Sequence, residues 1–154
     1  MRVLVIGGGA SGMVAALTAA RGGHQVTLLE RQSRLGRKLA ATGNGRCNLS
    51  NTHCAVSGYH GQNPDFVLPA LRAFPVAETR DWFCSLGLIT TVEPSGRVYP
   101  FSDQAGSVVD VLRLSVEEAG IQSETGSEVS SVFWDTDAFF AQTEQRRYAA
   151  DAVI

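Results

Sequence analysis

Six consecutive small residues near the N-terminus have the spacing of a phosphate-binding turn. The run Gly7-Gly8-Gly9-Ala10-Ser11-Gly12 fits the pattern G-x-G-x-x-G. The first glycine of that pattern permits a tight turn, the second lets a pyrophosphate approach the backbone, and the third lets a helix pack closely on a sheet. Glu30 lies 23 residues after Gly7 and would accept hydrogen bonds from ribose hydroxyls. The pattern therefore predicts a dinucleotide site at a helix N-terminus.

The residues around this run form the strand–helix–strand unit that such a site needs. Residues 3–6 and 26–29 are continuous apolar runs, typical of parallel strands buried on both faces. A helix is predicted from 10 to 21, ending at Gly22-Gly23. A signal peptide or membrane helix over residues 3–20 is disfavoured, because each internal glycine costs about 0.8–1 kcal/mol relative to alanine. We therefore expect a cytoplasmic protein with no membrane partner.

Composition bounds the remaining possibilities. The chain has 154 residues, 44% of them hydrophobic, and a net charge of −2, which indicates one ordinary domain and excludes a disordered tail. Residues 1–54 carry +6, with Glu30 as their only acid, whereas residues 55–154 carry −8. The near-zero total argues against a nucleic-acid partner, and the basic first third predicts an anionic ligand there. Five of its cations lie in one polar stretch: Arg31, Arg34, Arg37, Lys38 and Arg46.

Downstream of this unit the sequence alternates between loops, helices and short strands. Residues 31–63 are predicted to form a long loop, which inside a domain is usually functional or disordered. Helices are expected near 65–74 (interrupted by Pro69), near 76–86, and over 103–119 with Ser102 as N-cap and Gly120 as stop. Two strands, at 88–92 and 97–99, are expected on either side of a turn at 94–96. After Ile121 we expect a β-meander with strands at 129–134 and 138–143. A further strand is expected from 152 onward.

Three stretches resemble a known family. The runs GGGASGMVAALTAA and LLERQSRLGRKLAATGNGRCNLSN are similar to the amino-terminal FAD-binding region of BaiN/YhiN-like flavoproteins, also called the aminoacetone-oxidase family of NAD(P)/FAD-dependent oxidoreductases. The segment from Gly96 to Ser102 resembles the same family. The match is strong over residues 3–51, fair over 95–114 and faint elsewhere. It implies an α/β, Rossmann-like FAD-binding domain of the glutathione-reductase-like fold.

The resemblance also implies roles for individual residues. FAD is the implied cofactor, with NAD(P)H as a candidate electron donor and an unknown small molecule as substrate. The residues implied to hold the pyrophosphate are Gly7, Gly9, Ala10, Ser11 and Gly12. Those implied at the adenosine end are Glu30, Arg31 and the backbone of Val129, and those towards the ribityl chain and flavin are Arg37, Lys38, Thr42, Asn44 and Asn48.

Chains of this family are considerably longer, so we expect residues 1–154 to be one FAD-binding domain that is incomplete at its C-terminus. Its expected parts are the βαβ unit (1–30), a cofactor loop (31–63), a helical and hairpin insert (64–101), and a helix with a β-meander (102–154). The isolated chain is expected to be inactive. Two alternatives stay open: an NAD-binding dehydrogenase domain, and a non-catalytic truncated remnant.

Other reactive residues suggest less. The spacing of the cysteines and histidines (Cys47, His53, Cys54, His60, Cys84) fits no zinc motif, so no metal is expected. Cys47 is either a redox thiol facing the flavin, with a thiolate favoured by nearby cations, or a packed thiol, which is commoner. Cys84 is expected in the core beside Trp82 and Phe83, and Trp134 in the meander core with Phe139-Phe140. No nucleophile–base pair is apparent, and flavin chemistry needs none.

Overall fold

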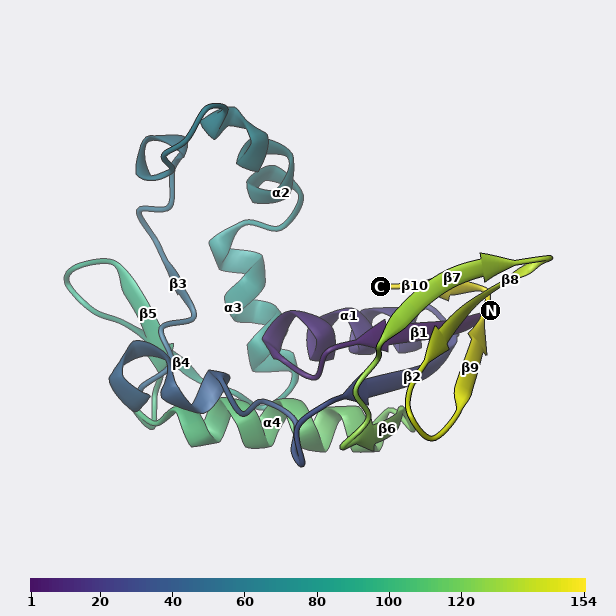
Figure 1. Cartoon of the computed structure of the whole chain (residues 1–154). Coiled ribbons are helices and arrows are strands. Elements are labelled where there is room, and N and C mark those ends of the chain that lie inside the picture. The colour runs from purple at the N-terminus through teal and green to yellow at the C-terminus, as the bar shows by residue number, and fades with distance from the viewer. The chain divides into compact units, whose positions relative to one another are not determined.

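The computed structural model describes all 154 residues, which form two compact units (Figure 1). The first unit comprises residues 1–40 and 109–154, and the second comprises residues 41–108. No helix in the chain is both long enough and apolar enough to cross a bilayer.

A four-stranded parallel sheet is the centre of the first unit. Its order is β10 (Ala152–Val153), β1 (Arg2–Ile6), β2 (Gln25–Glu30) and β6 (Gln122–Thr125). The strands predicted at 3–6 and 26–29 are confirmed, and so is the helix α1, which spans Ala10–Arg21. The strand β6 lies in the stretch that we expected to belong to the meander. It pairs in parallel with β2 instead, and therefore extends the nucleotide-binding sheet.

The apolar pattern of these elements becomes the core of the unit. Leu4 on β1 and Leu28 on β2 are almost fully buried, as are Met13 and Leu17 on the inner face of α1. Burying a side chain of this size stabilises the fold by about 1.5–3 kcal/mol relative to exposing it. The sheet and α1 are thus held together by the face that the sequence predicts.

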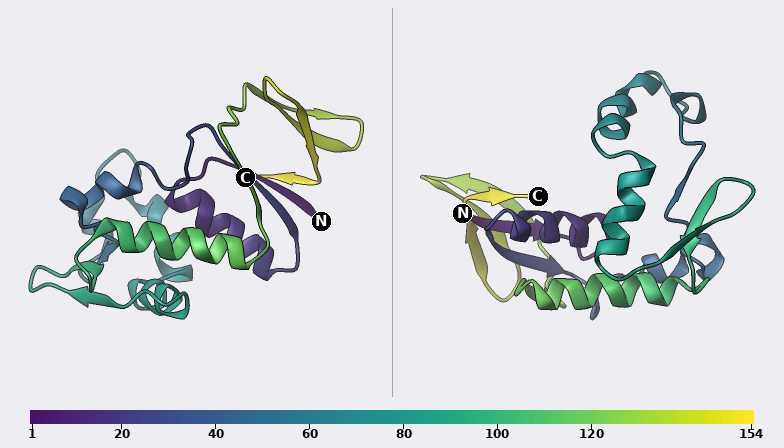
Figure 2. Two further views of the ribbon diagram at one scale, coloured as in Figure 1. Left: turned by 90° about the horizontal axis from the view of Figure 1, so that it is seen from below. Right: turned by 180° about the vertical axis from the view of Figure 1, so that it is seen from behind.

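A three-stranded antiparallel meander completes the first unit. Its strands are β7 (Ser131–Asp135), β8 (Ala138–Gln142) and β9 (Arg147–Ala150), in that order. Ala141 and Ala150 pack on Leu4 and Leu29 of the parallel sheet. The meander therefore covers one side of β1 and β2, opposite α1 (Figure 2, left).

One expected core residue of the meander is not in the core. The Trp134 side chain is 57% exposed, so its assignment to the core is wrong. It stands near the end of β7, next to the tight turn that leads to β8, where the ring of Phe139 contacts it edge-on, 4.8 Å away between centroids. Phe139 and Phe140 are half-buried.

The second unit contains a small antiparallel sheet and short helices. The sheet has the order β3 (Ser50–Asn51), β5 (Arg97–Pro100) and β4 (Thr90–Val92). The helices of this part of the chain are the 3₁₀ segments η1 (Leu39–Gly45), η2 (Val56–Gly58) and η3 (Pro64–Val67), and the α-helices α2 (Leu68–Ala73) and α3 (Val76–Ser85). The expectation of one long loop over 31–63 is thus wrong, because η1, β3 and η2 fall inside it.

Three further expectations concern helix ends and burial. Pro69 divides the predicted 65–74 helix into η3 and α2, and it lies in the first turn of α2, where its missing N–H is not needed. The helix α4 (Ala105–Glu118) begins two residues later than predicted, and the Ser102 hydroxyl bonds the Ser107 hydroxyl at 2.8 Å. Cys84 is exposed on α3 while its neighbour Phe83 is buried, so the core assignment of Cys84 is wrong.

Candidate functional site

The glycine-rich turn between β1 and α1 is built as the pattern requires. Gly7 has φ +107°, a conformation that L side chains rarely adopt, and its N–H donates to the Leu29 carbonyl at 2.7 Å. A Cβ on Gly12 would lie 1.8 Å from the Gly7 carbonyl oxygen. Both positions therefore need glycine for the fold itself, whether or not a ligand is bound.

Gly9 differs, because a Cβ there would meet nothing within 4 Å. Gly9 is the N-cap of α1, with no side-chain cap, and the first turn of α1 contains no acid. The first N–H groups of a helix lack intrahelical partners and carry partial positive charge, so open space in front of them suits an anion. The absence of a side chain at Gly9 leaves the room that a pyrophosphate would need.

The Glu30 carboxylate is fixed beside this turn. One of its oxygens accepts a 2.6 Å hydrogen bond from the Gly8 N–H, and the other accepts a 2.7 Å bond from the Gln32 N–H. A carboxylate has about four lone-pair sites, so each oxygen can still accept a hydroxyl. The acid predicted to bind ribose is therefore half-buried, oriented and still able to accept hydrogen bonds.

Gly8 is a structurally constrained position that the sequence pattern leaves unspecified. A Cβ on Gly8 would lie 2.4 Å from Leu35 Cδ2 and 3.0 Å from the Glu30 Cβ. The Gly8 carbonyl also accepts a 2.8 Å hydrogen bond from the Gly36 N–H. The basic segment after β2 (residues 31–38) thus folds back onto the glycine-rich turn, and a side chain at position 8 would require Leu35 and Glu30 to shift.

The segment before the meander lies alongside the end of β2. Ser127 N–H donates to the Glu30 carbonyl and Gly126 N–H to the Gln32 carbonyl, both at 2.9 Å. Arg31 forms a loose, exposed ion pair of 3.7 Å with Glu128, the kind of contact that contributes little to stability. Val129 is half-buried against the core formed around Leu4 and Leu29. The structure therefore brings the predicted adenosine-end residues together.

The cations of the basic segment differ in how strongly they are engaged. Arg37 donates to the Gln32 side-chain oxygen. Lys38 and Arg34 are exposed and form no ion pair. These two charges are available to an anionic ligand of the first unit.

Three predicted flavin-side residues, Thr42, Asn44 and Asn48, belong to the second unit. The Asn48 amide nitrogen lies 3.2 Å from the Ser50 carbonyl and 3.3 Å from that of Val98, so it connects its loop to the sheet. Asn44 is exposed and has φ +56°. Cys47 is only 2% exposed, and burial raises the pKa of its thiol, although a hydrogen bond with Thr42 opposes the shift. A packed thiol therefore describes Cys47 better than an activated thiolate.

Arg46, counted above among the cations of the basic stretch, is fully engaged within the second unit. It donates to Glu93 at 2.6 Å and to Asp103 at 2.5 Å, and its guanidinium lies 3.9 Å from the centroid of the Tyr99 ring. The hydrogen bonds to these two acids raise its pKa further above the ordinary arginine value. Its charge is neutralised locally and is not available to an anion.

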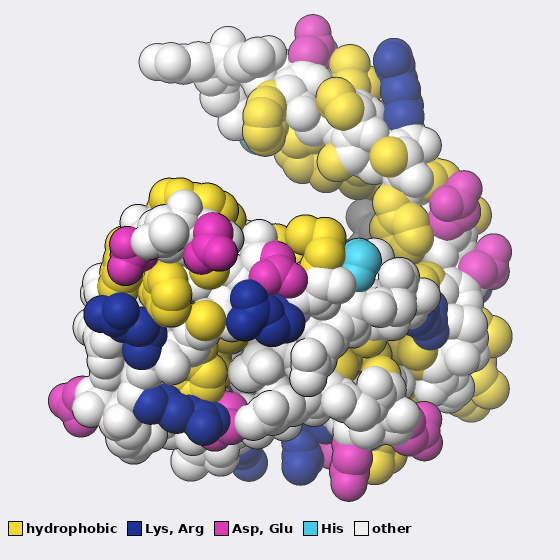
Figure 3. Space-filling view, turned by 90° about the vertical axis from the view of Figure 1, so that its right-hand side faces the viewer, with side chains coloured by type: hydrophobic (Ala, Val, Ile, Leu, Met, Phe, Trp, Pro, Cys, Tyr) yellow, Lys and Arg dark blue, Asp and Glu magenta, His cyan; other side chains and the backbone are white.

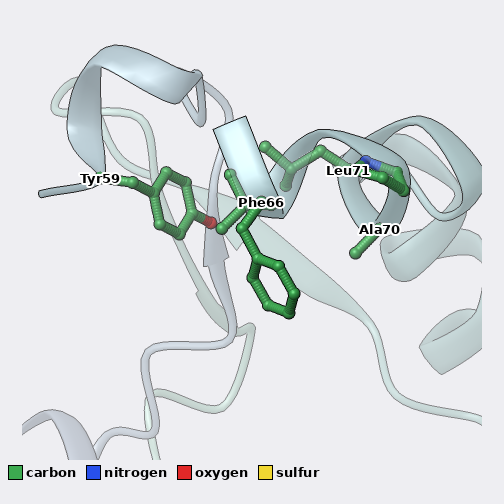
Figure 4. Close-up of a pocket in the computed structure, with 6 residues that line it drawn as sticks. Tyr59, Phe66, Ala70 and Leu71 are labelled. Carbon is green, nitrogen blue, oxygen red and sulfur yellow. The ribbon is translucent and has the colours of Figure 1, made fainter. Parts of the chain in front are cut away.

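The second unit also has an apolar hollow of about 500 Å³. Tyr59, Phe66, Ala70 and Leu71 line it, together with Val67 and Pro69 (Figure 4). Hydrophobic side chains also gather on the surface of this helical segment, at the top of the view in Figure 3. The hollow contains no charged side chain and none of the predicted site residues.

Comparison with known proteins identifies relatives over the whole chain. The family model described as HI0933-like protein Rossmann domain matches residues 1–154. A 3-dehydro-bile acid delta(4,6)-reductase from Clostridium scindens is 43% identical over 155 residues, which cover 99% of this chain and 38% of the relative. A ribosomal RNA dihydrouridine synthase from Escherichia coli is 32% identical over 136 residues, covering 88% of this chain and 34% of the relative. The chain thus spans little more than a third of these curated relatives.

Solved structures share the fold at low sequence identity. THI4 of Thermovibrio ammonificans matches with a TM-score of 0.65 and 15% identity, covering 99% of this chain and 54% of that one. The 3-ketosteroid-delta4-(5alpha)-dehydrogenase of Rhodococcus jostii RHA1 matches with a TM-score of 0.63 and 18% identity, covering 99% and 44%. These likenesses confirm the α/β Rossmann-like fold.

Proposed function

Because this chain belongs to the HI0933-like family of FAD-dependent oxidoreductases, we propose that it is the FAD-binding portion of an oxidoreductase that transfers hydride or electrons through FAD. The family binds FAD through its Rossmann domain, which is the part that this chain spans. When bound, FAD supplies the hydride chemistry, and the residues of the chain bind and orient it.

One observation carries this proposal: the open space in front of Gly9 lies at the turn on which the Glu30 carboxylate is fixed. In our assignment the N–H groups of Ala10 and Ser11 hold the pyrophosphate and Glu30 accepts the ribose hydroxyls. Arg31 and the backbone of Val129 lie towards the adenine. The residues assigned to the ribityl chain and flavin are Arg37, Lys38, Thr42, Asn44 and Asn48.

Two features favour FAD over a nicotinamide dinucleotide at this site. An acid at position 30 repels a 2′-phosphate, which disfavours NADP. Lys38 and Arg34 are exposed cations without partners on the segment that folds back onto the turn, and a simple NAD site needs no such segment. An NAD-binding dehydrogenase domain is the second candidate. It is supported only by the βαβ unit.

The reaction class can be proposed from the relatives. The names of the Clostridium scindens and Escherichia coli proteins denote a reductase and an enzyme that forms dihydrouridine. Both names describe reduction of an organic substrate. From these relatives we carry over only the reaction class, which is reduction of an organic substrate by a flavin.

Calorimetric titration of the purified chain with FAD and, separately, with NAD tests the proposal. We expect FAD to bind and to give the protein a flavin absorbance that survives gel filtration, with NAD binding much more weakly. Preferential binding of NAD would favour the dehydrogenase alternative. Absence of binding by either dinucleotide, with strong ANS fluorescence, would favour the non-catalytic remnant.

A further inference from the structure

We propose that Arg46 is a positioning residue, which locks the segment from Thr42 to Asn48 in the conformation that presents its side chains to the flavin end of FAD. The inference rests on the proposed function, because it assumes that Thr42, Asn44 and Asn48 lie towards the ribityl chain and flavin. Arg46 lies inside the second run that resembles the flavoprotein family, and the resemblance assigns it no role.

The backbone of this segment turns in the left-handed sense. Gly43, Asn44 and Gly45 have φ values of +56°, +56° and +82°, and the Arg46 N–H donates to the Gly43 carbonyl at 3.1 Å. Cys47, with φ +60°, donates its N–H to the Thr42 carbonyl at 3.0 Å. Residues other than glycine rarely adopt such conformations and do so mostly singly.

The non-glycine residues with positive φ gather around Arg46. Asn44, Cys47 and Asp103 are three of the four non-glycine residues with positive φ in the chain. Asn44 and Cys47 flank Arg46 in sequence, and Asp103 accepts a hydrogen bond from its guanidinium. Asparagine and aspartate tolerate this region, but a cysteine there is strained, and such strain persists only where surrounding contacts over-determine it.

The side chain of Arg46 supplies contacts of that kind. Its three partners come from three different places: Glu93 follows β4, Tyr99 is on β5, and Asp103 precedes α4. A planar guanidinium can donate along two edges and stack on a ring at once, which an ammonium group cannot do. The side chain is 34% exposed, so these bonds are partly shielded from water.

The turn that Arg46 holds is also closed on itself. A Cβ on Gly43 would lie 2.7 Å from the Asn48 backbone nitrogen and 3.4 Å from the Tyr99 ring. The Asn48 amide is bound to the backbone of the sheet as described above. Because its parts touch one another, release of Arg46 would displace the predicted flavin-facing side chains together.

The test compares the parent chain with Arg46→Lys, using two ligands measured by calorimetry. FAD carries a ribityl chain and flavin in addition to its adenosine and pyrophosphate groups. ADP has only the adenosine and pyrophosphate groups, which the first unit binds in our assignment. We expect Arg46→Lys to weaken FAD binding about tenfold or more, since two charge-assisted hydrogen bonds are disturbed, and to leave ADP binding unchanged. The visible circular dichroism of bound FAD should change as well.

Two further variants make the result specific. Arg97→Lys is the matched control, because Arg97 is exposed on β5 of the same sheet and forms no ion pair, and it should bind both ligands like the parent. Asp103→Asn removes one partner of Arg46 but keeps a side chain that tolerates positive φ. It should weaken FAD binding in the same direction, with ADP binding unchanged, and serves if Arg46→Lys fails to fold.

The outcomes are distinguishable. If Arg46→Lys and Asp103→Asn bind FAD as tightly as the parent does, the positioning role is overturned and the proposed function is left intact. A parallel loss of FAD and ADP binding also overturns it, because it indicates general destabilisation. A parent chain that binds ADP but no FAD, or neither ligand, contradicts the proposed function and this inference with it.

Discussion

Glu30 accepts a hydrogen bond of 2.6 Å from the backbone N–H of Gly8, which precedes it by 22 residues. Its second oxygen accepts a hydrogen bond from the N–H of Gln32, so the carboxylate bridges the glycine-rich turn and the start of the basic segment. The acid therefore shapes the protein turn and, in our proposal, also offers its remaining lone pairs to ribose. Each task gives a different expectation for its replacement.

We predict that Glu30→Gln weakens both FAD binding and folding. Glutamine keeps one acceptor oxygen, but its NH₂ group must then face either the Gly8 or the Gln32 N–H, so one backbone donor loses its partner. Binding should weaken by roughly 1–3 kcal/mol and the free energy of unfolding should fall by a similar amount, in the range for hydrogen bonds to charged groups. FAD titration and urea denaturation measure the two effects.

The control for that variant is Glu128→Gln. Glu128 is an exposed acid a few residues from the same site, with only the loose contact to Arg31. We expect its replacement to change stability by less than about 0.5 kcal/mol. If Glu30→Gln behaves like this control in both assays, Glu30 is not part of the site.

The glycines at positions 9 and 12 should separate binding from folding. Gly9→Ala adds a methyl group that meets no protein atom, so the variant should melt like the parent but lose FAD affinity, because the methyl group occupies the space of the pyrophosphate. Gly12→Ala places a methyl group against the Gly7 carbonyl and should destabilise the fold by about 1–3 kcal/mol. Thermal melts with FAD titrations check both, and a Gly9→Ala variant with full affinity would contradict the assigned pyrophosphate position.

Thiol reactivity should follow burial and pKa. The Cys47 thiol is buried and its pKa is raised, so it stays protonated near neutral pH, whereas Cys84 is exposed on α3. Iodoacetamide should therefore modify Cys84 first, and Cys47 only when the chain unfolds. Peptide mass mapping over a time course measures the order in which the two thiols are modified. Rapid modification of Cys47 in the native protein would support the redox-thiol interpretation instead.

The acid stability of the sheet should depend on Asp151. The Arg2 side chain, and then its backbone N–H, hold the pKa of this carboxyl below its usual range by hydrogen bonding. A lowered folded-state pKa means that the contribution to stability is complete above about pH 4, the unfolded value, and disappears as the pH falls through the folded value. Denaturation midpoints should thus separate the parent from Asp151→Asn at pH 6 and converge at low pH.

An exposed acid elsewhere provides the comparison for this variant. Asp110 on α4 has only a 3.7 Å pair with Arg113 one turn later, so Asp110→Asn should follow the parent at every pH. A gap between the parent and Asp151→Asn that stays constant down to acid pH would show that the carboxyl acts through its shape rather than its charge.

The β1–α1–β2 unit could be predicted from the sequence because its signals are local. The apolar runs, the glycine spacing and Gly22-Gly23 each act on their immediate neighbours, and the boundaries of α1 agree to the residue. The resemblance to flavoproteins, which the family match confirms, rests on the same local runs. The role of Gly8 was missed because its reason is a contact with Leu35, far along the chain.

Other features depend on partners that sequence periodicity does not show. Arg46 looks like one cation among five until Glu93 and Asp103, 47 and 57 residues away, are placed against it. Trp134 has the composition of a core residue, but its position at the end of a hairpin leaves it exposed. The stretch 31–63 lacks periodicity because its 3₁₀ segments and its two-residue strand are too short to produce one.

The position of β1 in the sheet has a consequence for how the protein is made. On one side β1 pairs with β2, which follows it closely in sequence. On the other side it pairs with β10, which is far along the chain and places Ala152 opposite Val3. At about 5–20 residues per second, synthesis of the roughly 120 residues between β2 and β10 leaves the second edge of this apolar strand without a partner for roughly 6–25 s. An unpaired strand edge is prone to join another chain. The nascent chain should therefore depend on chaperones mainly until β10 emerges.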